Sequence, residues 1–349
     1  MPNSMKSIFS TLVLLLILFF PFSVQAQTQD PLRATITELS SGNIVVEIQE
    51  GKYTGEQMHV LQFDEKQIAI QGLHEGDQVL VNFIQGPGGK DQVIIVDQYR
   101  LWPLAGLFLL FLGVVVVIGR RKGFFAFLGM AFSFLIIAQM IVPQILIGNN
   151  PILISLFASL LIIPITFYIS HGINRKTTIA VLSTFFALVL TALLAVVFVD
   201  VAKLTGYAAE EANFINAQQG DHINIQALLL AGIIIGAMGV LDDITISQTS
   251  IVSKLKKANP KFSKWELFRE SMDVGHDHIA SLVNTLVLVY AGAALPLFVL
   301  FSSSQYGTLS DVLNMEIVAT EIVRTLVSSI GIVSAVPLTT IMAVWYMKD

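Results

Sequence analysis

The sequence predicts an α-helical polytopic membrane protein, with about seven transmembrane helices and a small N-terminal extracytoplasmic β domain, an OB-like barrel or a sandwich. The first observation is composition: 54% of the residues are hydrophobic, 13% are charged, and the mean hydropathy is +0.73. Soluble domains carry about 25% charged residues, so this chain is too apolar to be one. The second observation is that runs of membrane-spanning length fill residues 101–349. The third is that residues 27–98 instead hold short alternating runs punctuated by glycine.

The N-terminus has the pattern of a secretory signal peptide over residues 1–26. Lys6 precedes the apolar segment TLVLLLILFF, and VQA before Gln27 supplies the small residue of a cleavage site. An uncleaved transmembrane helix is the alternative, which Pro21 and the short apolar core disfavour. In both cases Gln27 is expected on the extracytoplasmic side.

Residues 27–98 are expected to form a separate β-rich domain outside the membrane. RATITEL, NIVVEIQEG, GEQMHVLQF, EGDQVLVNF and DQVIIVDQ are short runs of strand-forming residues bounded by turn residues. About five strands in so short a segment suit a small barrel, such as the OB type, or a sandwich. Mixed charges and few aromatic side chains argue against nucleic-acid binding, so we expect a cap or docking module.

Residues 101–349 form the predicted transmembrane domain, whose apolar segments are each near the roughly 20 residues that a bilayer core requires. We place the spans at Leu101–Ile118, Phe124–Val142, Ile152–Ser170, Thr177–Val199, Asn224–Leu241, Ala280–Phe301 and Ser328–Met347. A further helix, NMEIVATEIVRTLV, leads into the last span. Its charges predict that it lies at the interface or lines the bundle.

Lysine and arginine, which favour the cytoplasm, lie in alternate connections between these spans. They occur at 120–122, at 175–176 and in the loop 253–273, whereas the intervening connections hold one lysine. This predicts an outside N-terminal domain and a cytoplasmic C-terminus. Within the long loop, Ser263–Glu266 has the pattern of a capping box, so a helix should begin there and lie along the membrane surface.

Two neighbouring spans carry polar side chains near their cytoplasmic ends. On a helical wheel, Gly232, Gly236, Gly239 and Asp243 share one stripe, with Asp242 beside it, and the glycine spacing permits close helix packing. The next span has a second stripe, which consists of Asp273, Asp277, Ser281 and Asn284, with His276 and His278 on its flanks. An aspartate in mid-membrane costs about 2.5–3.5 kcal/mol on insertion scales, so such residues usually serve a function.

We therefore predict a polar cleft between the fifth and sixth spans, brought together at Gly232, Gly236 and Gly239. The residues expected to line a substrate or ion pathway there are Asp242, Asp243, Asp273, His276, Asp277, Ser281, Asn284 and Arg324. The alternative is that Asp242 and Asp243 mark a helix end, where they reach water or pair with Lys254 or Lys256.

Several motifs closely resemble the YibE/F family of bacterial multi-pass membrane proteins. They include GAMGVLDDITIS, ESMDVGHDHIASLVNTLVLVYAGAALPL, LNMEIVATEIVRTLVSSIGIVSAVPLTT, EGDQVLV, YRL and GNNP. The resemblance covers almost the whole chain and implies an integral protein of the bacterial inner membrane, without implying a biochemical activity. Where such proteins usually have Met-Asp and Gly-Arg-Asp, this chain has Leu241-Asp242 and Gly275-His276-Asp277. The change from Arg to His argues against a requirement for a fixed positive charge beside Asp277.

Three kinds of function compete. A permease would bind a cation, a proton or a small polar solute between the helices, and Pro164, Pro296 and Pro337 could break helices at membrane depth, as transporters require. A metal site could use Asp243, His276 and Asp277, although histidines 276 and 278 point to opposite sides of a helix. A non-transporting assembly or signalling subunit is the third.

Enzyme functions are disfavoured, because the motifs of intramembrane aspartyl and serine peptidases are missing and the chain has no cysteine. We expect a permease or transport-related protein without a cofactor. Its expected partners are the lipid bilayer, a small solute or cation, and either a second copy or an envelope protein.

Overall fold

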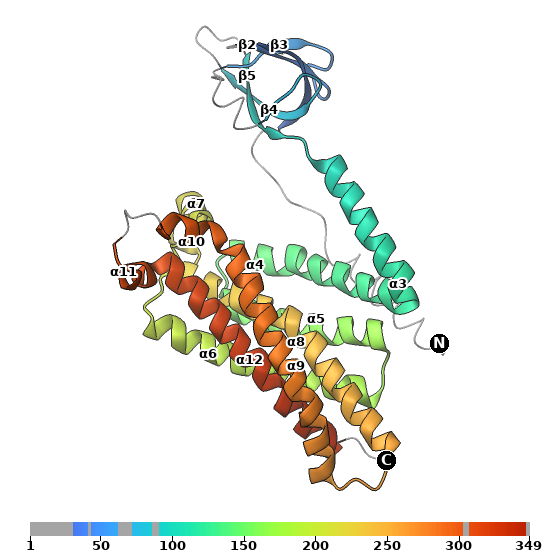
Figure 1. Ribbon diagram of the computed structural model, residues 1–349. Coiled ribbons are helices and arrows are strands. Elements are labelled where there is room, and N and C mark those ends of the chain that lie inside the picture. The colour runs from blue at the N-terminus through green and yellow to red at the C-terminus, as the bar shows by residue number, and fades with distance from the viewer. Residues whose placement is uncertain (1–30, 41–42, 62–71, 86–90, 303–306, 347–349) are drawn as a thin grey trace. The chain divides into compact units, whose positions relative to one another are not determined.

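The computed structural model describes residues 31–40, 43–61, 72–85, 91–302 and 307–346 (Figure 1). The predicted signal peptide lies outside these residues. The chain divides into two compact units, Met1–Val114 and Val115–Asp349.

The first unit contains a five-stranded antiparallel sheet with the strand order β3-β2-β1-β4-β5. The strands are β1 Leu32–Ser40, β2 Asn43–Ile48, β3 Gln57–His59, β4 Gln78–Gln85 and β5 Asp91–Gln98. The two edges meet, because Val60 pairs with Val93 in parallel and the Leu61 amide donates to the Val93 carbonyl oxygen at 2.9 Å. A link between the two edges is typical of a barrel, such as the OB type, and not of a sandwich. Its interior is filled by alternate strand residues, including Ile36 and Val46.

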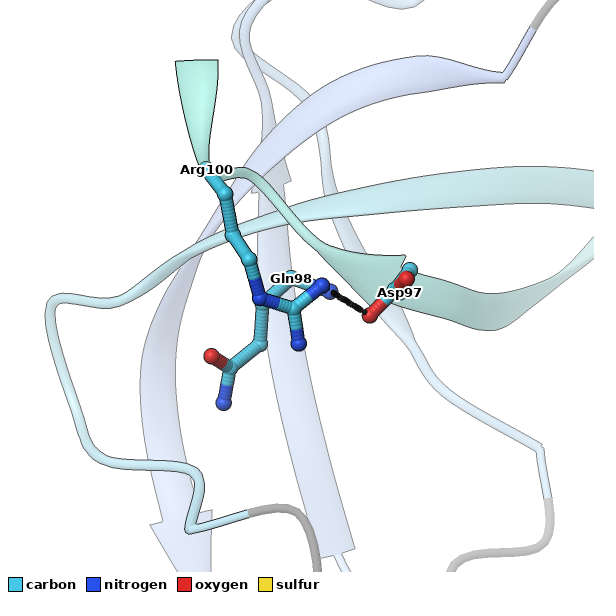
Figure 2. Close-up of polar contacts among 3 residues, drawn as sticks. All are labelled: Asp97, Gln98 and Arg100. Carbon is cyan, nitrogen blue, oxygen red and sulfur yellow. Dashed lines mark hydrogen bonds and ion pairs between the residues drawn. The ribbon is translucent and has the colours of Figure 1, made fainter. Parts of the chain in front are cut away.

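A polar contact fixes the chain between β5 and the first helix (Figure 2). The Asp97 carboxylate accepts hydrogen bonds from Arg100 Nη1 and from the Gln98 amide, both at 2.7 Å. The Arg100 guanidinium and, after it, the Gln98 amide hold the pKa of Asp97 below its usual value. Asp97 therefore stays charged and links the end of β5 to Arg100, the residue before α3.

Helices make up the rest of the described chain. They are α3 Leu101–Ile136, η1 Ile137–Ile141, α4 Val142–Leu146, α5 Pro151–His171, α6 Arg175–Val201, α7 Glu210–Gln219, η2 Gly220–His222, α8 Ile225–Ala258, α9 Lys264–Ala293, α10 Leu295–Ser302, α11 Leu309–Asn314 and α12 Glu316–Tyr346. Among the described residues, five helical segments are long and apolar enough to cross a membrane, or six if α9 and α10, which meet at a bend of 61°, form one span.

The first of these segments, Leu101–Leu146, is broken at Arg120, whose φ of 51° and ψ of −137° are not helical. A Cβ added at Gly123 would meet the carbonyl oxygen of Val115. In a straight helix, residues eight positions apart are separated by about 12 Å, so the chain turns back sharply here. The break coincides with the predicted boundary between the first and second spans.

Several helices are longer than predicted. α8 continues past Leu241 to Ala258, and the NMEIVATEIVRTLV segment and the last predicted span form one continuous helix, α12. The capping box at Ser263 and Glu266 is confirmed, but the helix that it begins, α9, continues to Ala293 instead of ending as a separate surface helix. Pro164 and Pro337 lie inside continuous helices and break neither; of the three prolines singled out, Pro296 alone lies at a bend.

α6, α8 and α12 pack against one another at the centre of the second unit (Figure 1). Their contact faces bury large apolar side chains such as Leu188, Ile244 and Ile332. Small hydroxyl residues lie between them, and the Thr184 and Thr245 hydroxyls are 2.6 Å apart. The contacts of α8 with α6 and α12 hold it in place in the unit.

The basic residues of three connections gather at one end of this unit, here called the basic end. Lys122, Lys254 and Lys257 all lie within electrostatic range of Lys176, whose ammonium group donates to Ser250 Oγ at 3.1 Å. At the opposite end, the Glu316 carboxylate accepts hydrogen bonds from the Thr205 hydroxyl and from the amides of Thr205 and Gly206, at 2.6–3.0 Å. This contact ties the loop after α6 to the start of α12.

Candidate functional site

Asp242 and Asp243 lie in the interior of α8, not at a helix end. The helix continues beyond them to Ala258. The hydroxyl groups of its polar segment are satisfied inside the helix, because they donate to carbonyl oxygens one turn earlier, as Thr245 does to Leu241 at 3.0 Å and Ser250 does to Ile246 at 2.7 Å.

Contacts between helices show which residues of the neighbouring helices lie level with the two aspartates. Thr245 is level with Thr184 of the antiparallel helix α6, so Asp242, three residues earlier, is level with about Ala187. That position is close to the centre of the predicted span Thr177–Val199. Gln248 Nε2 donates to Thr340 Oγ1 of α12 at 2.8 Å, which places Asp242 near the middle of the last predicted span as well.

The aspartates line a cavity of about 460 Å³ between α3, α5 and α8, which we call the aspartate pocket. Its walls are largely apolar, and its polar residues lie toward the basic end. The lining residues are Ala126, Met130, Ser133, Phe134, Ile137, Ile162, Thr166, Phe167, Ser170, His171, Ile235, Met238, Gly239, Asp242, Asp243 and Ile246.

One carboxylate oxygen of Asp242 is left without a partner. Thr166 Oγ1 donates to Asp242 Oδ2 at 3.4 Å, a long hydrogen bond. Oδ1 is inaccessible to solvent and has no hydrogen-bond partner among the described residues. Asp243 is exposed and lies within electrostatic range of His171. In the described part of the chain, neither aspartate forms an ion pair with Lys254 or Lys256.

A second cavity, of about 630 Å³, lies at the N-terminal end of α8 and is called the arginine pocket. Arg324 lines it and forms an ion pair with Glu321 at 3.0 Å, while its buried Nε has no partner among the described residues. Residues from the loop after α6, from α7, from the α9–α10 bend and from α12 complete the walls. The predicted cleft would require Arg324 to be a neighbour of Asp242 and Asp243. The structure places it in a different cavity.

One face of α8 lines both pockets. Ile225, Leu228, Leu229 and Gly232 line the arginine pocket, and Ile235, Gly239, Asp242 and Asp243 line the aspartate pocket. These positions recur at intervals of three and four residues, which place them along a single side of a helix. Only about one helical turn, around Gly232–Ile235, separates the two cavities along this face.

The polar stripe of α9 does not face α8. α9 packs on the rest of the unit through a different side, which includes Ser271, Gly275 and Leu286. The residues predicted to line the cleft from this helix are all exposed: Asp273, His276, Asp277, Ser281 and Asn284. The structure thus places the pocket of Asp242 and Asp243 against α3 and α5, and does not bring Asp243 and Asp277 together across a cleft.

The glycines that make close helix contacts also differ from those expected. A Cβ added at Gly232, Gly236 or Gly239 would meet no atom within 4 Å among the described residues, so these glycines leave α8 open instead of bringing a helix close. Tight crossings occur at Gly331, where an added Cβ would meet Thr191, and at Gly275, where it would lie 2.8 Å from Val336 Cγ1.

The metal candidates Asp243, His276 and Asp277 do not form a cluster. No group of three or more His, Asp or Glu side chains among the described residues is arranged to hold a metal ion. Sequence reasoning missed Thr166, His171 and Gln248. The Gln248 side chain is fully buried and donates to Ser271 O at 3.0 Å as well as to Thr340, so it links α8, α9 and α12. A lone glutamine in a run of hydroxyl residues gave no signal for this role.

Comparison with known families gives one match, in which residues 107–349 fit the family described as YibE/F-like protein. The match contains every residue of both pockets and of α9. Comparison with curated proteins and with solved structures gives no match.

Proposed function

The chain belongs to the YibE/F family, and we propose that this membrane protein is a permease that moves a cation or a small polar solute along the pocket-lining face of α8. The observation that carries the proposal is that a single face of α8 lines two cavities, one at the N-terminal end of the helix and one in its middle. A path along this face needs to open only at the turn around Gly232–Ile235. Gly232 in this turn and Gly236 directly after it leave room for a solute or a moving side chain.

The aspartate pocket has the chemistry of a binding site for a cation or a hydrogen-bond donor. The unpartnered oxygen of Asp242 is an acceptor held away from solvent, and an uncompensated polar group of this kind is costly unless a ligand satisfies it. Asp243 adds a second carboxylate at the same cavity, and Thr166 a hydroxyl. Apolar walls with a few converging polar groups are typical of small-molecule sites.

We further propose seven spans in the bacterial inner membrane, with the N-terminal domain outside and the C-terminus in the cytoplasm. The 46 residues of Leu101–Leu146 would extend for about 69 Å as one straight helix, more than twice the bilayer core of about 30 Å. The reversal at Arg120 supports two crossings instead. The gathering of Lys122, Lys176, Lys254 and Lys257 supports the assignment of the basic end to the cytoplasm.

Cysteine accessibility tests the path directly, because the chain has no cysteine of its own. Gly239→Cys should react with a membrane-impermeant thiol reagent added from the cytoplasmic side, and Gly232→Cys with the reagent added from outside. The matched control is Ala237→Cys, on the same helix but fully buried in the protein, which should stay unreacted. If neither Gly239→Cys nor Gly232→Cys reacts, this face of α8 lies against lipid, and the water-filled path is rejected.

Substitution of the carboxylates tests the function itself. Asp242→Asn and Asp243→Asn should abolish the difference in solute and metal content between cells with and without the protein, while protein level stays unchanged. Asp200→Asn, an exposed α6 aspartate outside both pockets, is the control and should keep the difference. If wild-type cells show no solute difference but altered amounts of envelope proteins, the chain is an assembly or signalling subunit instead.

A further inference from the structure

α9 carries a polar stripe on the side that faces away from the rest of the second unit. Asp273, Asp277, Ala280 and Asn284 are exposed along this stripe, which we call the α9 seam; His276 and Ser281 flank it. The residues through which α9 packs, Ser271, Gly275 and Leu286 among them, lie on the opposite side of the helix.

The α9 seam lies at the depth of the bilayer and not beyond it. Ser271 and Gly275 are level with Gln248 of the antiparallel helix α8, as the 3.0 Å hydrogen bond from Gln248 Nε2 to the Ser271 carbonyl requires. Counting along both helices puts Asp277 close to the level of Asp243, and Asn284 close to that of Ala237. Both levels fall within the stretch of α8 that packs against the apolar part of α6.

Lipid cannot cover such a face without a large cost. Each aspartate at the bilayer centre costs about 2.5–3.5 kcal/mol on insertion scales, and intramembrane polar residues almost always face protein or a water-filled cavity. No described residue covers the α9 seam. The predicted first span, Leu101–Ile118, is a poor cover because it contains no charged, hydroxyl or amide side chain.

We propose that the α9 seam is a contact between two copies of this chain, packed α9 against α9 about a two-fold axis parallel to the membrane normal. Both copies insert in the same orientation, so equal residues meet at equal depth. Asn284 then lies opposite Asn284 of the second copy, where two amides can exchange hydrogen bonds. His276 and Asp277 provide a donor and an acceptor at one level, so each copy satisfies the other reciprocally. Ala280, which lies between Asp277 and Asn284 along the helix, is small enough for the two α9 helices to approach closely.

Crosslinking in membranes tests this contact. Ala280→Cys and Asn284→Cys, each the single cysteine of its chain, should form a disulfide-linked product of twice the monomer mass under mild oxidation. Leu193→Cys is the matched control, because Leu193 of α6 is 61% exposed and lies at nearly the depth of Asn284, but on another side of the unit. Chance collisions would link all three variants, whereas a specific contact links only the two on α9.

The oligomeric state in detergent gives an independent measure. The wild type should sediment as a dimer, and Asn284→Leu should raise the protein concentration at half-dissociation about tenfold, as expected for one lost pair of interhelical hydrogen bonds. A wild type that is monomeric in mild detergent and does not crosslink at position 280 or 284 would overturn the proposal. So would crosslinks that join α9 only to a different protein. Neither measurement depends on transport, so the dimer can be disproved while the proposed permease function still holds.

Discussion

At Gly331 the backbone of α12 approaches α6 so closely that the Thr191 hydroxyl occupies the place of a side chain. Gly331→Ala must therefore push the two helices apart or force Thr191 into another rotamer. Overpacking of this kind costs about 1–3 kcal/mol. We expect a lower midpoint of thermal unfolding for the purified variant, measured by scanning fluorimetry in detergent.

Gly236→Ala is the control for this prediction at the residue scale. No atom lies within 4 Å of a Cβ added there, and alanine is the better helix former by about 1 kcal/mol. Its unfolding midpoint should therefore be unchanged or higher. Equal loss of stability in both variants would mean that α8 is covered along Gly236 by another surface, and that the contact at Gly331 is not the tighter one.

At the scale of elements, the Gln248 side chain joins three helices through two hydrogen bonds, to Ser271 of α9 and Thr340 of α12. Gln248→Met keeps most of the volume and removes both bonds. Interhelical hydrogen bonds in membrane proteins contribute about 0.6 kcal/mol on average and up to about 1.7 kcal/mol, so the loss should be modest. Gln248→Ala should be clearly worse, because it also leaves a cavity.

Chemical unfolding of the two Gln248 variants measures these differences. The order of stability should be wild type, then Gln248→Met, then Gln248→Ala. If Gln248→Met equals the wild type while Gln248→Ala is destabilised, the residue acts through its volume and the two hydrogen bonds contribute nothing. The link between α9 and α8 would then rest on packing, such as that of Gly275 against the Gln248 side chain.

The same elements explain how far the sequence could predict the structure. Apolar runs and the capping box at Ser263 predicted where most helices lie, because burial in lipid and end-capping are local properties. The end of α8 was misplaced because hydropathy drops after Leu241, whereas the helix continues and hydroxyl groups such as that of Thr245 are satisfied by a carbonyl oxygen of the same helix. The helical wheel found both polar stripes, but it cannot tell which side of α9 meets its neighbours. In the structure, the side of α9 that meets its neighbours is the one with the small buried residues Ser271 and Gly275.

For the candidate site, Asp242 and Asp243 line a cavity whose other walls come from α3 and α5 and not from the predicted sixth span, and their role in a pathway stays a prediction. Those walls depend on contacts between distant segments, such as that of Thr166 with Asp242, which no local pattern encodes. The glycine stripe was taken as a packing surface because Gly-x-x-x-Gly spacing serves that purpose in many membrane helices. Here the stripe is open, and it runs between two pockets instead.

At the scale of the whole molecule, orientation follows from which end carries the basic residues. Lys122, Lys176, Lys254 and Lys257 come from three connections yet lie together, so all three must be on one side of the membrane. That side should be the cytoplasm, because basic residues near span ends are retained there. A reporter fused after Lys122 or after Arg269 should therefore be cytoplasmic, and one fused after Gln219 should be external.

The fusion after Lys122 also decides the number of spans. If the chain crosses the membrane between Leu101 and Arg120 and returns after it, Lys122 is cytoplasmic while the N-terminal β domain is outside. If Leu101–Leu146 crosses only once, the β domain and the turn at Gly148 must lie on opposite sides of the membrane, and the number of spans falls to six.

A cysteine placed in the β domain and another placed at the turn near Gly148, each labelled by an impermeant reagent, distinguish the two cases. Labelling of both from outside is expected, since the backbone reversal at Arg120 and the close contact of Gly123 with Val115 leave the helix no straight path across.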